Sequence, residues 1–476
     1  MNYPGSKFDA SWRAALRPDD YRNPSPKSRY HLVVIGAGPA GLISAIGAAG
    51  LGADVALVEA NYMGGDCLNV GCVPSKALLE YTSRDGRDFD KAFAWVREVR
   101  AGIAPQDSVQ RYREQGVDVF LGRAELTGRG RVRVGDVSLH GRRIAICTGT
   151  RAALPPIEGL TDACPLTNET VFDLRERPAR LGILGAGPIG CELAQAFAGL
   201  GIEVHLFELA ARVLPGEIER ASAAVSAALT EAGVHLHLGD MVRRVEGRGP
   251  HLIVSDGAEV NADRVLVATG RIPNTENLGL EAAGVELDDG LVRVDAHLRT
   301  TNRRIFAAGD CASREQFTHH ADAQARALVQ NALFYPSARV DRLVVPHCTY
   351  THPEVASVGV APGSPETDTY RVEFGELDRG RTQDDRVGFA EIVTSTGSDT
   401  IVGATIVAAD AGEQIASLCL LMSNGMGLGT ARATVFAYPT RAEYLKRAAD
   451  AYNRTRLTPF AQRMFAAVLA FTRRLP

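Results

Sequence analysis

The sequence lacks a membrane-spanning segment, because none of its 476 residues belongs to an uninterrupted apolar run of about 18. Residues 1–30 are polar and contain no apolar signal-peptide core, so we expect a cytoplasmic location. The chain also lacks a basic excess: its formal charge is −4, which disfavours nucleic acid as a partner. A chain of this length is expected to form roughly two to four domains.

Cysteine is scarce, with eight residues, yet two stand close together in the stretch GGDCLNVGCVPSK, which runs from Gly64 to Lys76. Cytoplasmic cysteines are normally reduced, and a disulfide that forms there is usually catalytic or sensing. Cys67 and Cys72 could therefore be packing residues, half of a metal site or a working redox pair. A metal site is disfavoured because no second cysteine or histidine pair lies at ligand spacing, and the sequence predicts no resident metal.

The surroundings of the two cysteines favour reactivity. A helix is predicted to begin here, and cysteines five positions apart can reach disulfide distance if its first turn is distorted, which Gly71 permits. The positive end of that helix and Lys76 both favour thiolate over thiol. Cys164 lies in a predicted loop. The other cysteines are expected to pack in the core: Cys147, Cys191, Cys311, Cys348 and Cys419.

Glycine is abundant, with 48 residues, and three of them follow the apolar stretch HLVVIG in the GxGxxG spacing. Gly36 allows a tight turn, Gly38 lets the backbone approach a pyrophosphate, and Gly41 lets a helix pack close to a strand. A second strand, DVALVEA, ends in Glu59, which can bind the hydroxyls of a ribose. The segment therefore reads as a complete dinucleotide-binding unit.

The same unit occurs a second time. Gly185, Gly187 and Gly190 repeat the spacing, and the strand EVHLFE ends in Glu208. A single GxGxxG is a weak signal, but two complete strand–glycine–helix–strand–acid units predict two dinucleotide sites. An acid at position 208 favours NADH, because it can bind the 2′-hydroxyl of the adenosine ribose and repels the extra phosphate of NADPH. NADPH stays the alternative cofactor.

Other predicted strands end in residues suited to a ligand, since ligands of open α/β sheets bind at the carboxyl ends of the strands. The strands are IAICTG, VLVATG and RRIFAAGD. The candidate cofactor-binding residues from these strand ends, together with one glycine before the cysteine pair, are Thr148, Gly149, Gly270, Gly309, Asp310 and Gly65.

These patterns predict an α/β fold with two Rossmann-like dinucleotide-binding domains, one inserted in the other, followed by an α+β domain. A polar N-terminal leader is expected to be loosely ordered, and an amphipathic helical tail is expected at the other end. The predicted divisions are residues 1–28 for the leader, 29–155 and 272–345 for the first domain, 156–271 for the second, 346–456 for the third and 457–476 for the tail.

The tail carries apolar residues at helical spacing, with arginines among them. Two interpretations stay open: a helix docked on a dimer, which we favour, or a helix lying on a membrane surface. The apolar residues are Phe460, Met464, Val468, Phe471 and Leu475.

The order of motifs resembles that of the flavin-dependent pyridine nucleotide–disulfide oxidoreductases, which include dihydrolipoamide dehydrogenase, glutathione reductase and mercuric reductase. The motifs are GxGxxG, Cys-x4-Cys, Thr-Gly, a second GxGxxG, ATGRxPN and AGD, over roughly residues 30–455. The resemblance implies an FAD domain, an NAD(P) domain and an interface domain that forms a homodimer. It further implies that each active site is completed by the partner subunit.

The resemblance also implies roles for single residues. Cys67 would be the interchange thiol that meets the substrate. Cys72 would lie beside the flavin, form the charge-transfer complex and receive the electrons. Lys76 would lie near the flavin N5 edge, paired with Glu192, and Asp310 would bind the ribitol or pyrophosphate region of FAD. Electrons would pass from nicotinamide to flavin, to the disulfide and to an external acceptor.

One departure from the family pattern lies beside the first cysteine. Asp66 stands where well-known members carry Thr. Its carboxylate would either raise the pKa of the Cys67 thiol and disfavour anionic substrates, or point away and bond to backbone or cofactor.

A second departure lies in the stretch VFAYPTRAEYLK. Tyr438 stands where dihydrolipoamide dehydrogenases have a histidine base, followed by Pro439, Thr440 and Glu443, and a cis Tyr438–Pro439 peptide is expected. Tyrosine is a poor base at neutral pH, so exchange with lipoamide is disfavoured, and the pattern is closer to mercuric reductases. The alternative is that Tyr438 packs at the interface.

The acceptor stays open. Mercuric reductases end in a Cys-Cys pair that hands in the metal, whereas this chain has no cysteine after Cys419. A metal ion, a small disulfide or a quinone-like acceptor would each fit a thiol-reactive site. The rivals are dihydrolipoamide dehydrogenase itself and a non-catalytic redox sensor.

Overall fold

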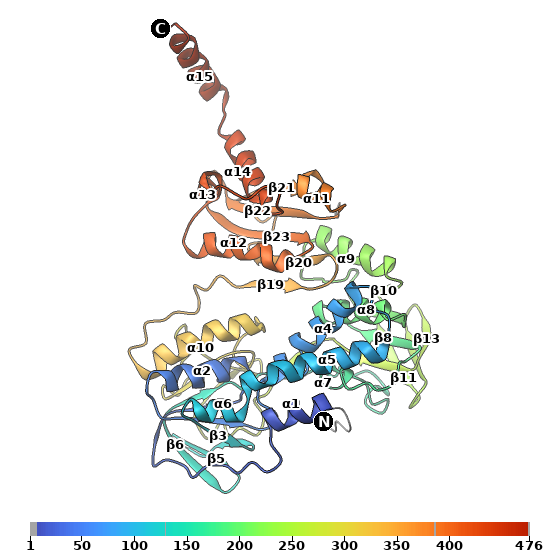
Figure 1. Ribbon diagram of the computed structural model, residues 1–476, viewed down its shortest axis with the longest axis vertical. Coiled ribbons are helices and arrows are strands. Elements are labelled where there is room, and N and C mark those ends of the chain that lie inside the picture. Colours follow the sequence, from blue (N-terminus) through green and yellow to red (C-terminus); the bar gives the residue numbers. More distant parts are fainter. Residues whose placement is uncertain (1–6, 129, 385–386, 475–476) are drawn as a thin grey trace. The chain divides into compact units, whose positions relative to one another are not determined.

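The computed structural model describes residues 7–128, 130–384 and 387–474, which form two compact units (Figure 1). The first unit comprises Met1–Arg212 and Leu229–Leu343, and the second comprises Val213–Ala228 and Val344–Pro476. The helix α9 (Glu219–Glu231) contains the point, after Ala228, at which the chain passes from the second unit to the first. Each unit is described by itself below.

The first unit contains a mostly parallel sheet with two antiparallel strands at one edge, and its central strand, β1 (Tyr30–Ile35), is buried on both faces. Leu32 and Val34 pack into one apolar cluster, and Val33 and Ile35 pack into another. Such two-sided burial explains the continuous apolar sequence, which is typical of parallel strands covered on both faces. In spatial order the sheet contains β3 (Val117–Leu121), β2 (Val55–Glu59), β1, β6 (Val137–Ile146), β5 (Arg131–Val134) and β4 (Ala124–Leu126), with β18 (Ile305–Ala307) also paired to β6.

The same unit contains a second parallel sheet, covered on one face by a smaller antiparallel sheet. The four parallel strands are β10 (His235–Leu238), β9 (Glu203–Glu208), β8 (Arg180–Leu184) and β14 (Arg264–Val267). The antiparallel strands are β11 (Val242–Glu246), β12 (His251–Ser255) and β13 (Glu259–Ala262). Two separate two-stranded sheets pair β7 (Thr150–Ala152) with β15 (Arg271–Pro273), and β16 (Leu287–Asp288) with β17 (Leu291–Val292).

Helices connect and cover these sheets in the order that parallel crossovers require. The first helix of each dinucleotide unit begins directly after the second glycine of its motif, and the third glycine lies in the first turn of the helix. The helices of this unit are α1 (Lys7–Leu16), α2 (Pro39–Gly50), α3 (Gly65–Asn69), α4 (Cys72–Ser83), α5 (Phe89–Ile103), η1 (Ala104–Asp107), α6 (Val109–Glu114), α7 (Asn168–Val171), α8 (Pro188–Gly199) and α10 (Thr318–Leu333).

The N-terminal helix α1 corrects one expectation. We expected a loosely ordered leader, but Trp12 is only 1% exposed and its indole Nε1 donates to Asn69 Oδ1 at 2.9 Å. The carboxylate of Asp9 is buried within 4.0 Å of Arg100 and 3.1 Å of Arg175. For residues 7–16 the expectation of loose order was wrong, because a polar composition concealed one apolar face and an acid whose arginine partners lie far along the chain.

The second unit is built on an antiparallel sheet with helices packed on its apolar face. In spatial order its strands are β19 (Pro346–Thr349), β20 (Glu354–Gly359), β23 (Ile401–Ala408), β22 (Phe389–Ser395) and β21 (Thr367–Glu373). Its remaining helices are η2 (Phe374–Glu376), α11 (Asp378–Thr382), α12 (Ala411–Ser423), α13 (Leu428–Ala433), α14 (Glu443–Thr455) and α15 (Pro459–Thr472).

The tail forms the helix α15, as the spacing of its apolar residues predicts. None of the residues of α15, all of which the structure describes, is buried, and Phe460 is 76% exposed. Leu475 lies outside the described residues. Among the helices within the described ranges, none combines the length and the apolar composition that crossing a membrane requires.

Candidate active site

The cysteine pair lies where two short helices meet. Cys67 lies inside α3 and is half-buried, whereas Cys72 is the first residue of α4 and is exposed. Between the helices the backbone turns at Gly71, where an added Cβ would lie 2.9 Å from the Asp66 carbonyl oxygen. The turn therefore needs glycine at this position, and the two cysteine side chains lie within hydrogen-bonding reach of each other.

The electrostatics of the pair differ between its two sulfurs. A hydrogen bond from the Cys67 thiol, helped by the Lys76 charge, lowers the pKa of Cys72 to about 6. The same hydrogen bond, together with burial, raises the pKa of Cys67 well above its ordinary value. The Thr318 hydroxyl, at the start of α10, lies 3.7 Å from the Cys72 sulfur. At neutral pH the reduced pair therefore holds one proton, on Cys67, and one negative charge, on Cys72.

Lys76 is positioned by a buried acid. Its Nζ donates to Glu192 Oε2 at 2.7 Å, which is the pairing that the family resemblance implies. Glu192 belongs to α8, its side chain is 5% exposed, and α8 packs against α4. A carboxylate buried to this extent needs a paired cation. The pair therefore holds the ammonium group one turn along α4 from Cys72.

Replacing Lys76 by methionine is expected to weaken the thiolate. The Lys76 charge lowers the pKa of Cys72, so Lys76→Met should move that pKa upward from about 6 toward its ordinary value of 9.0, by about one unit. The pH profile of iodoacetamide labelling at Cys72 in the reduced protein measures the shift. Lys76→Arg keeps the charge and is the control; equal profiles for the methionine and arginine variants would contradict the assignment.

The first glycine motif forms a cradle that side chains would fill. Gly36 has φ +101°, in the left-handed region that favours glycine. A Cβ on Gly41 would lie 1.8 Å from the Gly36 carbonyl oxygen, and one on Gly65 would lie 2.5 Å from the Gly38 Cα. The backbone of Gly65 thus lies directly beside the N-terminus of α2, where free N–H groups favour phosphate. These residues fit the pyrophosphate of a dinucleotide.

The second motif repeats this geometry. Gly185 has φ +100°, and a Cβ on Gly190 would lie 1.9 Å from the Gly185 carbonyl oxygen. At Gly187 no described atom lies within 4 Å of a Cβ position, so the N-terminus of α8 faces open space. The second site therefore also fits a dinucleotide phosphate.

The two acids that end the second strands are held in the same way. Glu59 accepts a hydrogen bond from the backbone N–H of Ala37 at 2.7 Å, and Glu208 accepts one from that of Ala186 at 2.8 Å. Burial raises the pKa of Glu59. Each carboxylate is thus fixed at the carboxyl end of its strand, where a ribose is expected.

The remaining candidate cofactor residues lie at strand ends, as predicted. Gly149, Gly270 and Gly309 all have positive φ. Asp310 Oδ2 accepts from the Thr150 hydroxyl at 3.4 Å, and burial raises the pKa of Asp310. The Thr148 carbonyl accepts from the Asn274 side chain at 3.0 Å.

The structure identifies a partner for Asp66 that the sequence did not suggest. The guanidinium of Arg271 donates to Asp66 Oδ2 and, at 2.6 Å, to the Thr150 hydroxyl. This ion pair favours the second of the two interpretations, in which the carboxylate points away from the Cys67 thiol. The signal was present, since Arg271 follows the ATG of the second strand-end motif, but no local pattern joins it to position 66.

Tyr438 and Glu443 belong to the second unit, whereas the cysteines belong to the first. The Tyr438–Pro439 peptide is cis, as expected. Tyr438 is 72% exposed within the chain, and its hydroxyl donates to Asp378 Oδ2 at 2.5 Å. That hydrogen bond raises the pKa of the tyrosine. Glu443 accepts from Arg447 at 3.0 Å.

The other cysteines divide by burial. Cys147, Cys191 and Cys311 are buried, in agreement with a packing role. Burial raises the pKa of the Cys147 and Cys311 thiols. Cys348 and Cys419 are only half-buried, and Cys164 is exposed.

Two Rossmann-like cradles and a thiol–thiolate pair in one chain define an oxidoreductase that works with dinucleotides and a redox-active dithiol. The chain belongs to the pyridine nucleotide-disulphide oxidoreductase family, whose main domain matches residues 30–325 and whose dimerisation domain matches residues 345–449. These matches confirm the predicted family and fold class. The family is FAD-dependent and uses pyridine nucleotides, and the dimerisation domain supports a homodimer.

Similar proteins carry different activities in their names. The chain is 33% identical to a mercuric reductase of Staphylococcus aureus over 89% of this chain and 83% of the relative. It is 32% identical to a dihydrolipoyl dehydrogenase of Bacillus subtilis over 88% of this chain and 95% of the relative. A Cu(II) complex of a mutant of the HOCl-induced flavoprotein disulfide reductase RclA from Escherichia coli is 28% identical, with a TM-score of 0.83 over 88% of this chain and 98% of that one.

Proposed function

We propose that this protein uses NADH to reduce a thiol-reactive acceptor through bound FAD and the Cys67–Cys72 pair, and that the acceptor is a soft metal ion or a small disulfide. The observation that carries the proposal is the unequal pair: a thiolate at Cys72, lowered in pKa to about 6, beside a thiol at Cys67. Such a pair is the product of adding two electrons and one proton to a disulfide.

The glycine cradles support the placement of both nucleotides. The unit of Gly36, Gly38 and Gly41 with Gly65 and Glu59 would hold FAD, because it lies next to the cysteine helices. Thr148, Gly149, Gly309 and Asp310 would complete that site. When bound, FAD supplies two-electron transfer between a nicotinamide and a disulfide.

The second cradle would hold the nicotinamide nucleotide. Gly185, Gly187 and Gly190 would take its pyrophosphate, and Gly270 lies at a neighbouring strand end. Glu208 is fixed by backbone hydrogen bonds, so it would meet the 2′-hydroxyl of NADH and repel the 2′-phosphate of NADPH.

The dithiol chemistry balances without a further reductant. With a small disulfide, the Cys67 sulfur would displace one half as a thiol, forming a mixed disulfide and losing its proton. The Cys72 thiolate would then attack the Cys67 sulfur, release the second half and restore the Cys67–Cys72 disulfide. With a soft metal ion, the ion itself would displace the Cys67 proton and be held by both sulfurs. With mercuric ion, a two-electron acceptor, the two sulfurs would then supply both electrons, restore the Cys67–Cys72 disulfide and release the reduced metal.

The residue at position 438 favours the metal ion. A small disulfide requires a base to take the Cys67 proton, and a tyrosine whose pKa is raised by Asp378 is a poor base. A soft metal ion needs no such base. The partner subunit's Tyr438 would instead orient the bound acceptor through its hydroxyl.

Removing that hydroxyl gives a testable result. Tyr438→Phe is expected to lower the rate of acceptor turnover by at least about 10-fold and to leave the rate of flavin reduction by NADH unchanged. Tyr438→His is expected to raise turnover with lipoamide. Stopped-flow absorbance separates the two half-reactions, and Tyr335→Phe, a change at another exposed tyrosine, is the matched control. Equal turnover in the Phe variant and wild type would remove Tyr438 from the site.

The test of the proposal is anaerobic reduction followed by a choice of acceptors. One equivalent of NADH is added to the purified protein, and NADPH is added to a parallel sample. Mercuric ion, Cu²⁺, glutathione disulfide and lipoamide are then supplied separately. Repeated turnover with a metal ion and NADH supports the proposal; turnover with lipoamide alone supports dihydrolipoamide dehydrogenase, and reduction without turnover of any acceptor supports a sensor.

A further inference from the structure

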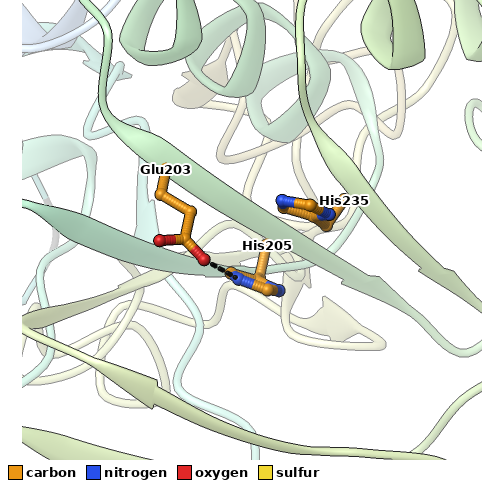
Figure 2. Close-up of side chains that lie close together, drawn as sticks. All are labelled: Glu203, His205 and His235. Carbon is orange, nitrogen blue, oxygen red and sulfur yellow. Dashed lines mark hydrogen bonds and ion pairs between the residues drawn. The ribbon is translucent and has the colours of Figure 1, made fainter.

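Three histidines and one glutamate share one face of the second parallel sheet. Glu203 and His205 are two positions apart on β9, and His235 and His237 are two positions apart on β10. In the parallel register His205 pairs directly with His235. Residues two apart on a strand, and direct partners on adjacent strands, project from the same face. Figure 2 shows Glu203, His205 and His235 side by side on these strands; with His237 we call them the histidine cluster.

The side chains of the histidine cluster are within interaction distance of one another. His205 Nε2 lies 3.1 Å from Glu203 Oε1, and its Nδ1 lies 3.0 Å from His237 Nε2. The rings of His205 and His235 stack with their centroids 4.6 Å apart. One nitrogen or oxygen from each of Glu203, His205 and His235 lies within 4.8 Å of the other two. Small rotations of the exposed Glu203 and His235 would bring these atoms to the separation that a shared ion requires.

We propose that Glu203, His205 and His235 bind a divalent transition-metal ion of the kind that prefers imidazole, such as Cu²⁺ or Zn²⁺. The ion would be bound by His205 Nε2, Glu203 Oε1 and one nitrogen of His235. Binding at Nε2 requires the tautomer of His205 that carries its proton on Nδ1. A metal-bound histidine normally donates that second N–H to a neighbouring acceptor. His237 Nε2 lies where such an acceptor is needed.

The surroundings restrict which ions the cluster accepts. Arg180 donates to Glu203 Oε2 at 2.9 Å, so only Oε1 remains for an ion, and the arginine charge opposes cations. The imidazoles must therefore supply most of the affinity, which disfavours Mg²⁺ and Ca²⁺, since these ions prefer oxygen. His237 is held in place by Phe207, whose ring stacks on it with centroids 4.3 Å apart.

The histidine cluster is separate from the nucleotide cradle on the same sheet. Glu203 is the first residue of β9, and Glu208, which would bind the ribose, is its last. His205, the proposed ligand nearest to Glu208 on this strand, is three residues away from it, which is about 10 Å of extended strand. An ion at the cluster would therefore not displace the nucleotide, and its function would not be electron transfer through the Cys67–Cys72 pair.

The experiment uses the tag-free holoenzyme with its cysteine pair oxidised, so that the paired sulfurs cannot bind the ion. Cu²⁺ is titrated in by equilibrium dialysis, and electron paramagnetic resonance reports its ligands. We expect one equivalent bound with a nitrogen-ligand signature. His235→Asn should weaken binding by at least about 10-fold and alter that signature. His140→Asn, at an exposed histidine on β6, should change neither.

Two outcomes would overturn the proposal: no stoichiometric Cu²⁺ in the wild-type protein, or equal affinity and spectra for His235→Asn and His140→Asn. Both substitutions are at exposed strand positions, and circular dichroism confirms that each variant is folded. A second variant, Glu203→Gln, also removes a proposed ligand at an exposed position. It should weaken binding and leave the nitrogen signature in place, whereas unchanged affinity would remove Glu203 from the site.

Discussion

In a Cys67→Ser variant, steady-state transfer of electrons from NADH to the acceptor is expected to fall by at least about 10³-fold. The reason is that the serine hydroxyl can neither form a disulfide with Cys72 nor bond covalently to a thiol-reactive acceptor. NADH should still bleach the flavin absorbance once per protein. Anaerobic stopped-flow absorbance measures both events in one experiment.

The same variant isolates the second cysteine. Without a partner, Cys72 stays reduced, and its thiolate should be present before any NADH is added, visible as long-wavelength absorbance beside bound flavin. The substitution removes the Cys67 thiol, whose hydrogen bond is the main cause of the lowered Cys72 pKa, so the transition should lie above the wild-type value of about 6. The thiolate and its absorbance should persist above that transition and be lost as the pH falls through it. Loss of Lys76 should move this transition upward.

Two controls make the result interpretable. Cys164→Ser changes an exposed cysteine outside the pair and should leave turnover intact. Cys72→Ser should abolish turnover and also the long-wavelength absorbance. If Cys67→Ser turns over at the wild-type rate, the two cysteines are not the working pair and the proposed function is wrong.

A Gly41→Val variant is expected to be purified without flavin and with a greatly lowered melting temperature. A Cβ at this position would lie 1.8 Å from the Gly36 carbonyl oxygen, so α2 could not remain in contact with β1. Displacing a helix from a close-packed core costs several kcal/mol, on the order of a large-residue insertion. Flavin content per protein and thermal unfolding measure the two effects.

The matched control lies six residues further along the same helix. A Cβ on Gly47 would meet the nearest atom, Cγ2 of Val329, at 3.7 Å, which is an ordinary contact. Gly47→Ala should therefore keep the flavin and stabilise the protein by up to about 1 kcal/mol, since alanine favours helix. Flavin retained by Gly41→Val at the wild-type level would show that this contact does not position the cofactor.

Much of the candidate site could be predicted because its signals are local. Gly36, Gly38 and Gly41 lie within six residues, and the acid that completes the unit follows one helix later. A backbone that must turn tightly and approach a phosphate excludes side chains, so the constraint is written directly into residue type. The cysteine pair is equally local, with Gly71 between its members.

The leader shows where local reasoning failed. Its composition predicts disorder, yet α1 is held by Trp12 and by the buried carboxylate of Asp9. The groups that satisfy Asp9 come from α5 and from Arg175, more than 80 residues away. A buried charge is stable only with such partners, and composition does not report which partners the fold brings close.

By itself, then, the sequence determined the family and predicted two dinucleotide units and a reactive cysteine pair, because each depends on residue types at short, fixed spacings. Only the tertiary structure decided the groups that join distant segments. Arg271 neutralises Asp66 across 205 positions, and the register of β9 with β10 places His205 beside His235. Such contacts depend on strand order and register, which are set by the burial of whole faces and not by any local pattern.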